Sequence, residues 1–114
     1  MKGRERDRAA LEDMRRYAAN VTTHTRSGRD ALTHELTLHA VLWELAILGE
    51  AANRVSEPVR ASHPEVPWRR IINQRNILVH VYDQVDIDLL WQAVEAIPEL
   101  DRQIASMLDE PGGP

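Results

Sequence analysis

The sequence predicts an all-α protein, a helical bundle of four main helices and one short helix. Apolar residues recur with the 3.6-residue spacing of a helix along most of the chain, and almost no segment alternates as a strand would. These apolar residues are mostly Ala, Leu, Ile and Val, and Phe is absent. Because 114 residues suffice for one modest core, we expect a single domain over residues 1–110 and a disordered tail at residues 111–114.

Two long helices are expected in the first half of the chain. The first spans about residues 4–26 and ends at Ser27-Gly28. Its apolar stripe consists of Leu11, Met14, Tyr17, Ala18 and Val21. The second spans about residues 31–56, and its apolar stripe consists of Leu38, Val41, Leu42, Leu45, Leu48, Ala52 and Val55. The small residues Gly49, Ala51 and Ala52 predict that another helix packs closely against this second helix.

A short helix and a longer one are expected next. Pro58 suits the first turn of a short helix that ends near Ser62, and residues 63–67 form a turn. Pro67 opens the following helix, because proline at the first turn loses no needed hydrogen bond. We expect this helix to end near Tyr82.

The last predicted helix begins after Asp86, which has the side chain of a good N-cap. Its apolar stripe consists of Ile87, Leu90, Trp91, Val94, Ile97, Ile104 and Leu108. Because the stripe stays in phase across Pro98, we expect one long helix with a kink there.

Composition and charge narrow the class of protein. There is no Cys, so disulfides and thiolate chemistry are excluded, and a charged N-terminus without a long apolar run predicts a cytoplasmic protein with no membrane contact. The net charge of -4 argues mildly against a general nucleic-acid binder. However, residues 1–30 carry eight basic and five acidic side chains, and residues 60–82 carry four basic and one acidic. Residues 83–114 carry one basic and eight acidic side chains. A local basic surface is therefore compatible with the acidic total.

The strongest candidate site lies in the helix that Pro67 opens, where Arg75, Asn76, His80 and Tyr82 spell RNxxxHxY. Arg75 offers a charged fork of donors that matches phosphate oxygens, and His80 can take and give a proton near neutrality. Asn76 adds an amide with donors and an acceptor. A ribonuclease that works without metal needs a base, an acid and a cation for the phosphorus oxygens. The alternative is that Arg75 forms a salt bridge and His80 fills a satisfied core position.

Helix geometry puts Arg75 and His80, the two main candidate residues, on different faces of the helix. At about 100° per residue, His80 lies about 140° from Arg75 and on the side of Asn76. Either the helix deforms near its end, or long side chains reach around it, or a second copy of the chain completes the site. We favour the last two together.

Other histidines and the tryptophans are expected to have structural roles. His34 and His39 are five residues apart, whereas a zinc-binding helical pair needs a spacing of four. We therefore expect them at the surface or in helix packing. Trp43, Trp68 and Trp91 fall on or near apolar stripes, which predicts core positions.

Four blocks in order resemble the HepT-like branch of the HEPN superfamily. They are GEAANRVS at 49–56, PW at 67–68, RNILVHVY at 75–82 and VDIDLLW at 85–91. The resemblance covers about residues 7–108. Many relatives have Gly where this chain has Val81, and an aromatic residue where it has Asp83.

The resemblance implies an antiparallel helical bundle that forms a homodimer, with the RxxxxHxY motifs of both subunits lining a cleft. It implies a metal-independent endoribonuclease toxin of a two-gene toxin–antitoxin system that cleaves tRNA or mRNA and uses no cofactor. Arg75 and His80 match the catalytic pair, and Asn76 is a supporting residue. Tyr82 matches the tyrosine that an MntA-type minimal nucleotidyltransferase antitoxin modifies with AMP. Such a modification would add charge and bulk two residues from His80 and block RNA.

Two other functions stay open from the sequence. One is a non-catalytic HEPN interaction module that binds a nucleotidyltransferase partner, which suits the acidic balance. The other is a purely structural helical dimer, which leaves the clustered polar residues unexplained.

Overall fold

The computed structural model describes residues 2–80 and 85–111, except for the side chains of Arg75 and residues 77–80. Its helices are α1 (Gly3–His24), the 3-10 helix η1 (Arg29–Thr33), α2 (Glu35–Arg54), α3 (Glu57–Ser62), α4 (Trp68–His80), α5 (Ile87–Glu95) and α6 (Ile97–Leu108). These residues contain no strand. The all-α prediction is therefore confirmed. None of the helices in the described ranges is long and apolar enough to cross a bilayer.

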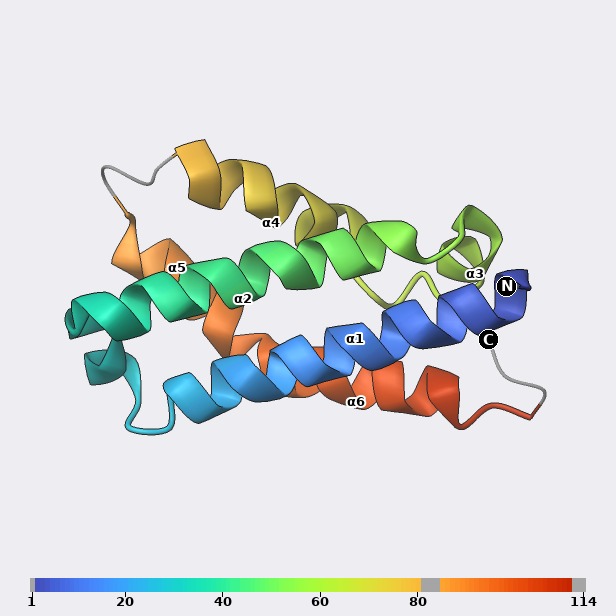
Figure 1. Cartoon of the computed structure of the whole chain (residues 1–114), viewed down its shortest axis with the longest axis horizontal. Helices are drawn as coiled ribbons and strands as arrows, with labels where there is room; N and C mark the ends of the chain where they lie inside the picture. Colours follow the sequence, from blue (N-terminus) through green and yellow to red (C-terminus); the bar gives the residue numbers. More distant parts are fainter. Residues whose placement is uncertain (1, 81–84, 112–114) are drawn as a thin grey trace.

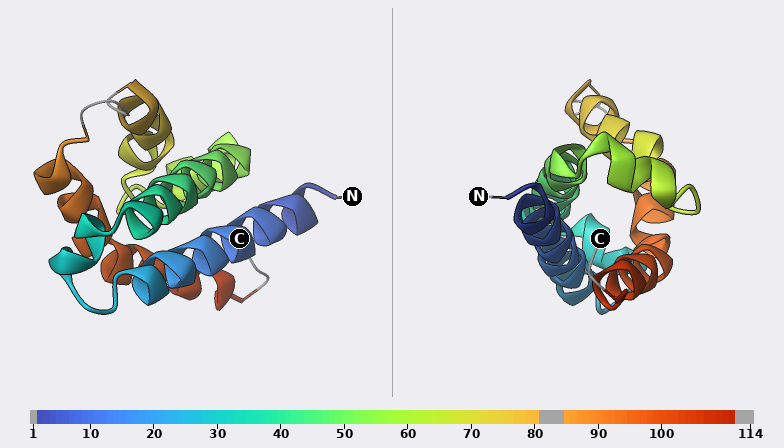
Figure 2. Two further views of the ribbon diagram at one scale, coloured as in Figure 1. Left: turned by 60° about the vertical axis from the view of Figure 1, so that its left-hand side comes forward. Right: turned by 90° about the vertical axis from the view of Figure 1, so that its right-hand side faces the viewer.

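The long helices lie side by side in the order α4, α2, α1, α6, and each runs antiparallel to its neighbour (Figure 1). Seen from the end, α5 lies between α4 and α6 and closes the bundle on the remaining side (Figure 2). The predicted apolar stripes fill the space between these helices. Leu11, Met14 and Val21 of α1 and Val41 and Leu45 of α2 are buried in one core cluster, as the helical spacing predicts.

The predicted boundaries of the first helix are close to those of α1. The predicted start of the second helix is wrong. Gly28 adopts a φ of 90°, a conformation that glycine tolerates best, and turns the chain after α1. The expected helix from Ala31 is instead the 3-10 helix η1, followed by an extended His34 before α2 begins at Glu35. Because Ala31 and Leu32 are buried at this turn, core packing overrides the local helix preference.

The last predicted helix is also corrected, since α5 and α6 are two separate helices joined at Ala96. Pro98 has no N–H to donate to the carbonyl of Val94, and its ring would clash with that carbonyl in a continuous helix. The N–H of Ala96 contacts this carbonyl instead, and Pro98 occupies the first turn of α6. The predicted cap at the other end is confirmed, because the Asp86 carboxylate accepts from the N–H of Leu89 at 3.1 Å.

The tryptophan prediction holds in part. Trp68 is buried, and Trp91 is partly buried against the core. Trp43 is 64% exposed, so its predicted core position is wrong. The buried face of α2 runs through Val41 and Leu45, and Trp43 lies about 200° around the helix from each of them.

The predicted close approach to the second helix is confirmed at Gly49. A Cβ atom built on Gly49 would lie 2.7 Å from the carbonyl oxygen of Ile71 in α4. No larger residue fits there unless the two helices move apart. The α4 helix begins at Trp68, with the Pro67 carbonyl accepting from Ile71 at 3.1 Å, and it includes His80. Its predicted end at Tyr82 lies outside the described residues, as does most of the predicted 111–114 tail.

Substitution at Gly49 should weaken folding by separating α2 from α4. We expect Gly49→Ala to lower the free energy of unfolding by about 1–3 kcal/mol, the range of an overpacked core position, measured by urea denaturation. Gly3→Ala is the matched control, because nothing lies within 4 Å of its Cβ. Equal urea midpoints for the two variants would contradict this role of Gly49.

A polar cluster holds the C-terminal end of α6 against α3 and the loop that follows it. His63 Nδ1 lies 3.0 Å from the carbonyl oxygen of Val59, and Nε2 lies 2.6 Å from the Glu110 carboxylate. Only the protonated ring can donate both bonds. Burial lowers the pKa of His63, but the hydrogen bonds to Glu110 and Val59, with the charges of Glu110 and Glu65, together raise the pKa above its ordinary value. The Trp68 indole also donates to the His63 carbonyl at 3.0 Å.

The contribution of this cluster to the free energy of unfolding should fall as pH rises. Because the folded-state pKa of His63 is raised, its stabilising contribution is fully present below the unfolded value of about 6.5 and is lost as pH rises through the folded value. Glu110→Gln should therefore destabilise the protein most at about pH 5.5–6.5 and progressively less above that window, in urea denaturation across pH. Glu95→Gln, an exposed position on α5, is the control. A pH-independent effect of Glu110→Gln would overturn this account.

Candidate functional site

Arg75, Asn76 and His80 of the predicted motif lie in one unbroken helix. The backbone of α4 is α-helical from Trp68 to His80, so Arg75 and His80 belong to the same regular helix, five residues apart. Deformation of the helix before His80 is therefore not observed. By helix register the two positions lie about 140° apart. Their side chains and all of Tyr82 lie outside the described part of the chain.

Asn76 is the motif residue whose surroundings the structure describes. It is exposed and lines a groove of about 540 Å³ on the surface of the bundle. The groove lies where α1, α2 and α4 meet, and it is lined by Tyr17, Ile47, Gly49, Glu50, Asn53, Arg54, Ile72, Asn73 and Asn76. His80 follows Asn76 by four residues on α4, about 40° away by register. The groove therefore extends along the helix face on which the motif histidine lies.

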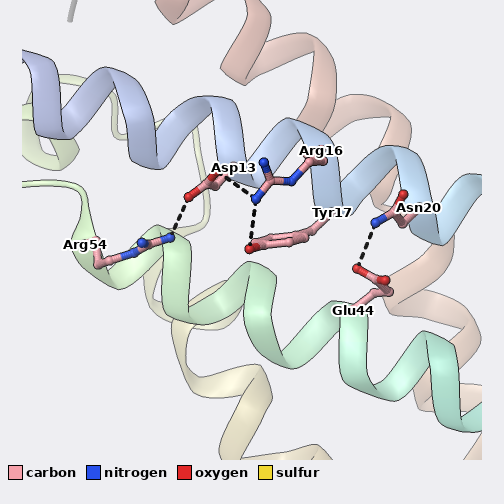
Figure 3. A network of polar contacts seen from close by, with 6 residues as sticks. All are labelled: Asp13, Arg16, Tyr17, Asn20, Glu44 and Arg54. Atoms are coloured by element: carbon pink, nitrogen blue, oxygen red, sulfur yellow. Dashed lines mark hydrogen bonds and ion pairs between the residues drawn. The ribbon is translucent and has the colours of Figure 1, made fainter.

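A network of charged side chains borders the groove on its α1 side (Figure 3). The Asp13 carboxylate accepts from Arg16 at 3.1 Å and from Arg54 at 3.0 Å. Arg16 also donates to the Tyr17 hydroxyl at 3.3 Å, and its guanidinium lies 5.1 Å from the centroid of the Tyr17 ring. One carboxylate thus holds two guanidinium groups beside the groove.

Sequence reasoning identified Asn76 but missed the other groove residues. Asn73 and Asn76 lie three residues apart on one helix, a spacing that predicts a shared face. This signal could have added Asn73 to the candidate site. Asn53 and Tyr17 come from other helices, and no local pattern links them to α4.

The remaining histidines take the structural roles expected from the sequence. His24, His34 and His39 are exposed, and His63 belongs to the cluster with Glu110. Within residues 2–80 and 85–111, no group of three or more His, Asp or Glu side chains could hold a metal ion.

An all-α bundle whose α4 contains an Arg and a His five residues apart has the architecture of the HEPN superfamily. The family model described as ribonuclease HepT-like matches residues 8–107. The chain therefore belongs to the HepT-like ribonuclease family.

Several curated proteins are similar to this chain over most of their length. "Probable ribonuclease HepT" of Thermococcus cleftensis is 37% identical over 93 residues, which cover 79% of this chain and 84% of that protein. "Putative RNase MJ1380" of Methanocaldococcus jannaschii is 31% identical over 100 residues, 85% of this chain and 92% of that protein. A "Putative RNase" of Caldanaerobacter subterraneus is 31% identical over 85 residues, 74% of this chain and 76% of that protein. No solved structure gives a significant match.

Proposed function

We propose that this protein is a metal-independent endoribonuclease that acts as the toxin of a two-gene toxin–antitoxin system. One observation carries the proposal. The regular helix α4 of a HepT-like bundle contains Arg75, Asn76 and His80 and borders a polar groove that Arg54 also lines. The names of the curated relatives support the same reaction class.

In the proposed reaction, the 2'-hydroxyl oxygen attacks the adjacent phosphorus and the 5'-oxygen of the next nucleotide leaves. His80 acts as the base that takes the 2'-hydroxyl proton or as the acid that protonates the leaving oxygen. Arg75 stabilises the charge on the phosphorane oxygens. Asn76 orients the phosphate or His80. The products are a 2',3'-cyclic phosphate and a free 5'-hydroxyl, so bonds and protons balance without a further reactant.

This mechanism predicts that the 2'-hydroxyl is indispensable. An oligonucleotide with a single 2'-deoxy nucleotide at the cut position should be inert, while the same substitution elsewhere in the strand should leave cleavage unchanged. The measurement is gel separation of end-labelled RNA, with the product ends identified by mass. Cleavage at the deoxy position, or a linear phosphate as the primary product, would show that another nucleophile operates.

We further propose that the active form is a homodimer whose cleft contains the motifs of both copies. A regular helix separates Arg75 from His80 by about 140°, and a second copy removes that conflict. The surface of α2 is suited to contact a second copy of the chain, because Leu36 is 86% exposed and Trp43 is 64% exposed. These two residues lie seven apart on one helix face, and Ile47, one turn after Trp43, lines the groove. A second copy that covers Leu36 and Trp43 would lie beside the groove and the motif helix.

Mixing two inactive variants tests the shared site directly. Arg75→Ala and His80→Ala should each abolish RNA cleavage and growth arrest, while remaining folded and dimeric. Co-expressed, they should recover about a quarter of wild-type cleavage, because about half of the dimers are mixed and each mixed dimer has one intact site of two.

His24→Ala, which changes an exposed histidine of α1, is the control and should stay active. If a mixture shown to contain heterodimers recovers no RNA cleavage, each site must be built within one chain. A His80→Ala variant that unfolds or stays toxic would remove His80 from the catalytic pair.

Regulation is proposed through Tyr82. An MntA-type minimal nucleotidyltransferase would add AMP to its hydroxyl and place phosphate charge two residues from His80, which repels RNA. If well-folded wild-type protein cleaves no RNA yet binds such a partner, the chain is instead the non-catalytic interaction module.

A further inference from the structure

Three asparagine side chains line the groove beside Asn76. The sequence contains four asparagines, and three of them, Asn53, Asn73 and Asn76, line this one groove. All three are exposed, and they come from the facing helices α2 and α4. An amide presents both donors and an acceptor, which is the combination that the edge of a nucleobase requires. A general anion site would need cations in these positions instead.

The remaining lining suits the flat face of a base. Ile47 of α2 and Ile72 of α4 are half-buried apolar side chains of the lining, and Tyr17 contributes an aromatic ring from α1. Gly49 adds no side chain between them. Unpaired bases are commonly held in this way, with the face against apolar or aromatic groups and the edge hydrogen-bonded.

Charge around the groove separates a place for phosphate from a place for the base. Arg54 and Arg16 both contact the Asp13 carboxylate on the α1 side, and their remaining guanidinium donors suit a phosphate. The strand backbone is therefore expected along the arginines, with a base directed into the groove.

We infer that this groove binds one unpaired nucleobase of the RNA strand, next to the bond that is cut. Asn73 and Asn53 read the edge of the base, and Arg54 holds the neighbouring phosphate. The inference rests on the proposed function, since it makes the groove the specificity subsite of that nuclease. Asn76 and His80 are separated by one helical turn, about 6 Å of rise, which is within reach of one nucleotide.

The test uses an RNA library randomised around a single cut position, with sequencing of the cleaved ends. Wild-type protein should prefer particular bases at one position beside the cut. Asn73→Ala and Asn53→Ala should each reduce that preference about ten-fold, the effect of losing one good side-chain contact to a base edge. Gln74→Ala is the matched control, because Gln74 lies on the same helix but lines a different groove, between α4 and the α5–α6 pair. It should leave the preference intact.

A second comparison separates base reading from a structural effect. The preferred nucleotide is replaced by an abasic one, and kcat/KM is measured for wild-type protein and for Asn73→Ala. With wild-type protein the abasic substrate should lose more than about ten-fold, because it removes the face contacts as well as the edge contacts. With the abasic substrate, Asn73→Ala should cost much less than about ten-fold, because the edge contact that it removes is already missing.

Three results are distinguishable. If the losses caused by the abasic substrate and by Asn73→Ala multiply, the inference is overturned and the proposed nuclease function stands. The same holds if both asparagine variants keep the base preference unchanged. Loss of the preference in Gln74→Ala as well would attribute it to α4 as a whole and also overturn the inference. Absence of cleavage by the wild type would instead reject the proposed function.

Discussion

The contact between α2 and α4 at Gly49 is the constraint on which the candidate site depends. The backbone of α4 approaches so closely that a Cβ on Gly49 would lie 2.7 Å from the Ile71 carbonyl oxygen. This approach aligns Asn73 and Asn76 of α4 with Asn53 of α2 along one groove. A larger side chain at Gly49 would separate the helices and widen the groove between these amides. Packing of the core and geometry of the site are therefore set by the same residue.

The proposed action on RNA has to be compatible with an acidic protein. The formal charge is -4, yet two guanidinium groups share one carboxylate beside the groove. Residues 83–114 carry eight of the 18 acidic side chains and one basic side chain. In the proposed function, this acidic balance limits non-specific affinity for phosphate backbones and leaves selection to contacts with the base.

The regularity of α4 connects the proposed chemistry to assembly. In the regular helix α4, positions 75 and 80 lie about 140° apart by register. In the proposed dimer the two residues come from different chains, and the isolated chain would lack a complete site. The exposed apolar residues Leu36 and Trp43 on α2 are consistent with such an assembly, because large apolar side chains gathered on one surface commonly mark contact sites.

The sequence by itself determined the helical class, most helix boundaries to within a few residues, the cap at Asp86 and the close packing at Gly49. These features follow from periodicity and local side-chain chemistry, which act over a few neighbouring residues. Sequence also singled out Arg75, Asn76 and His80 as the chemical candidates, and their catalytic roles stay a prediction.

Only the tertiary structure decided where α2 begins, how the chain breaks at Ala96, and that Trp43 faces outward. It also brought Asn53 and Tyr17 to the groove of Asn73, and Glu110 to His63. The last pair is separated by 47 residues. Such contacts depend on which helix faces pack together, and that choice is made by the whole core rather than by any local pattern.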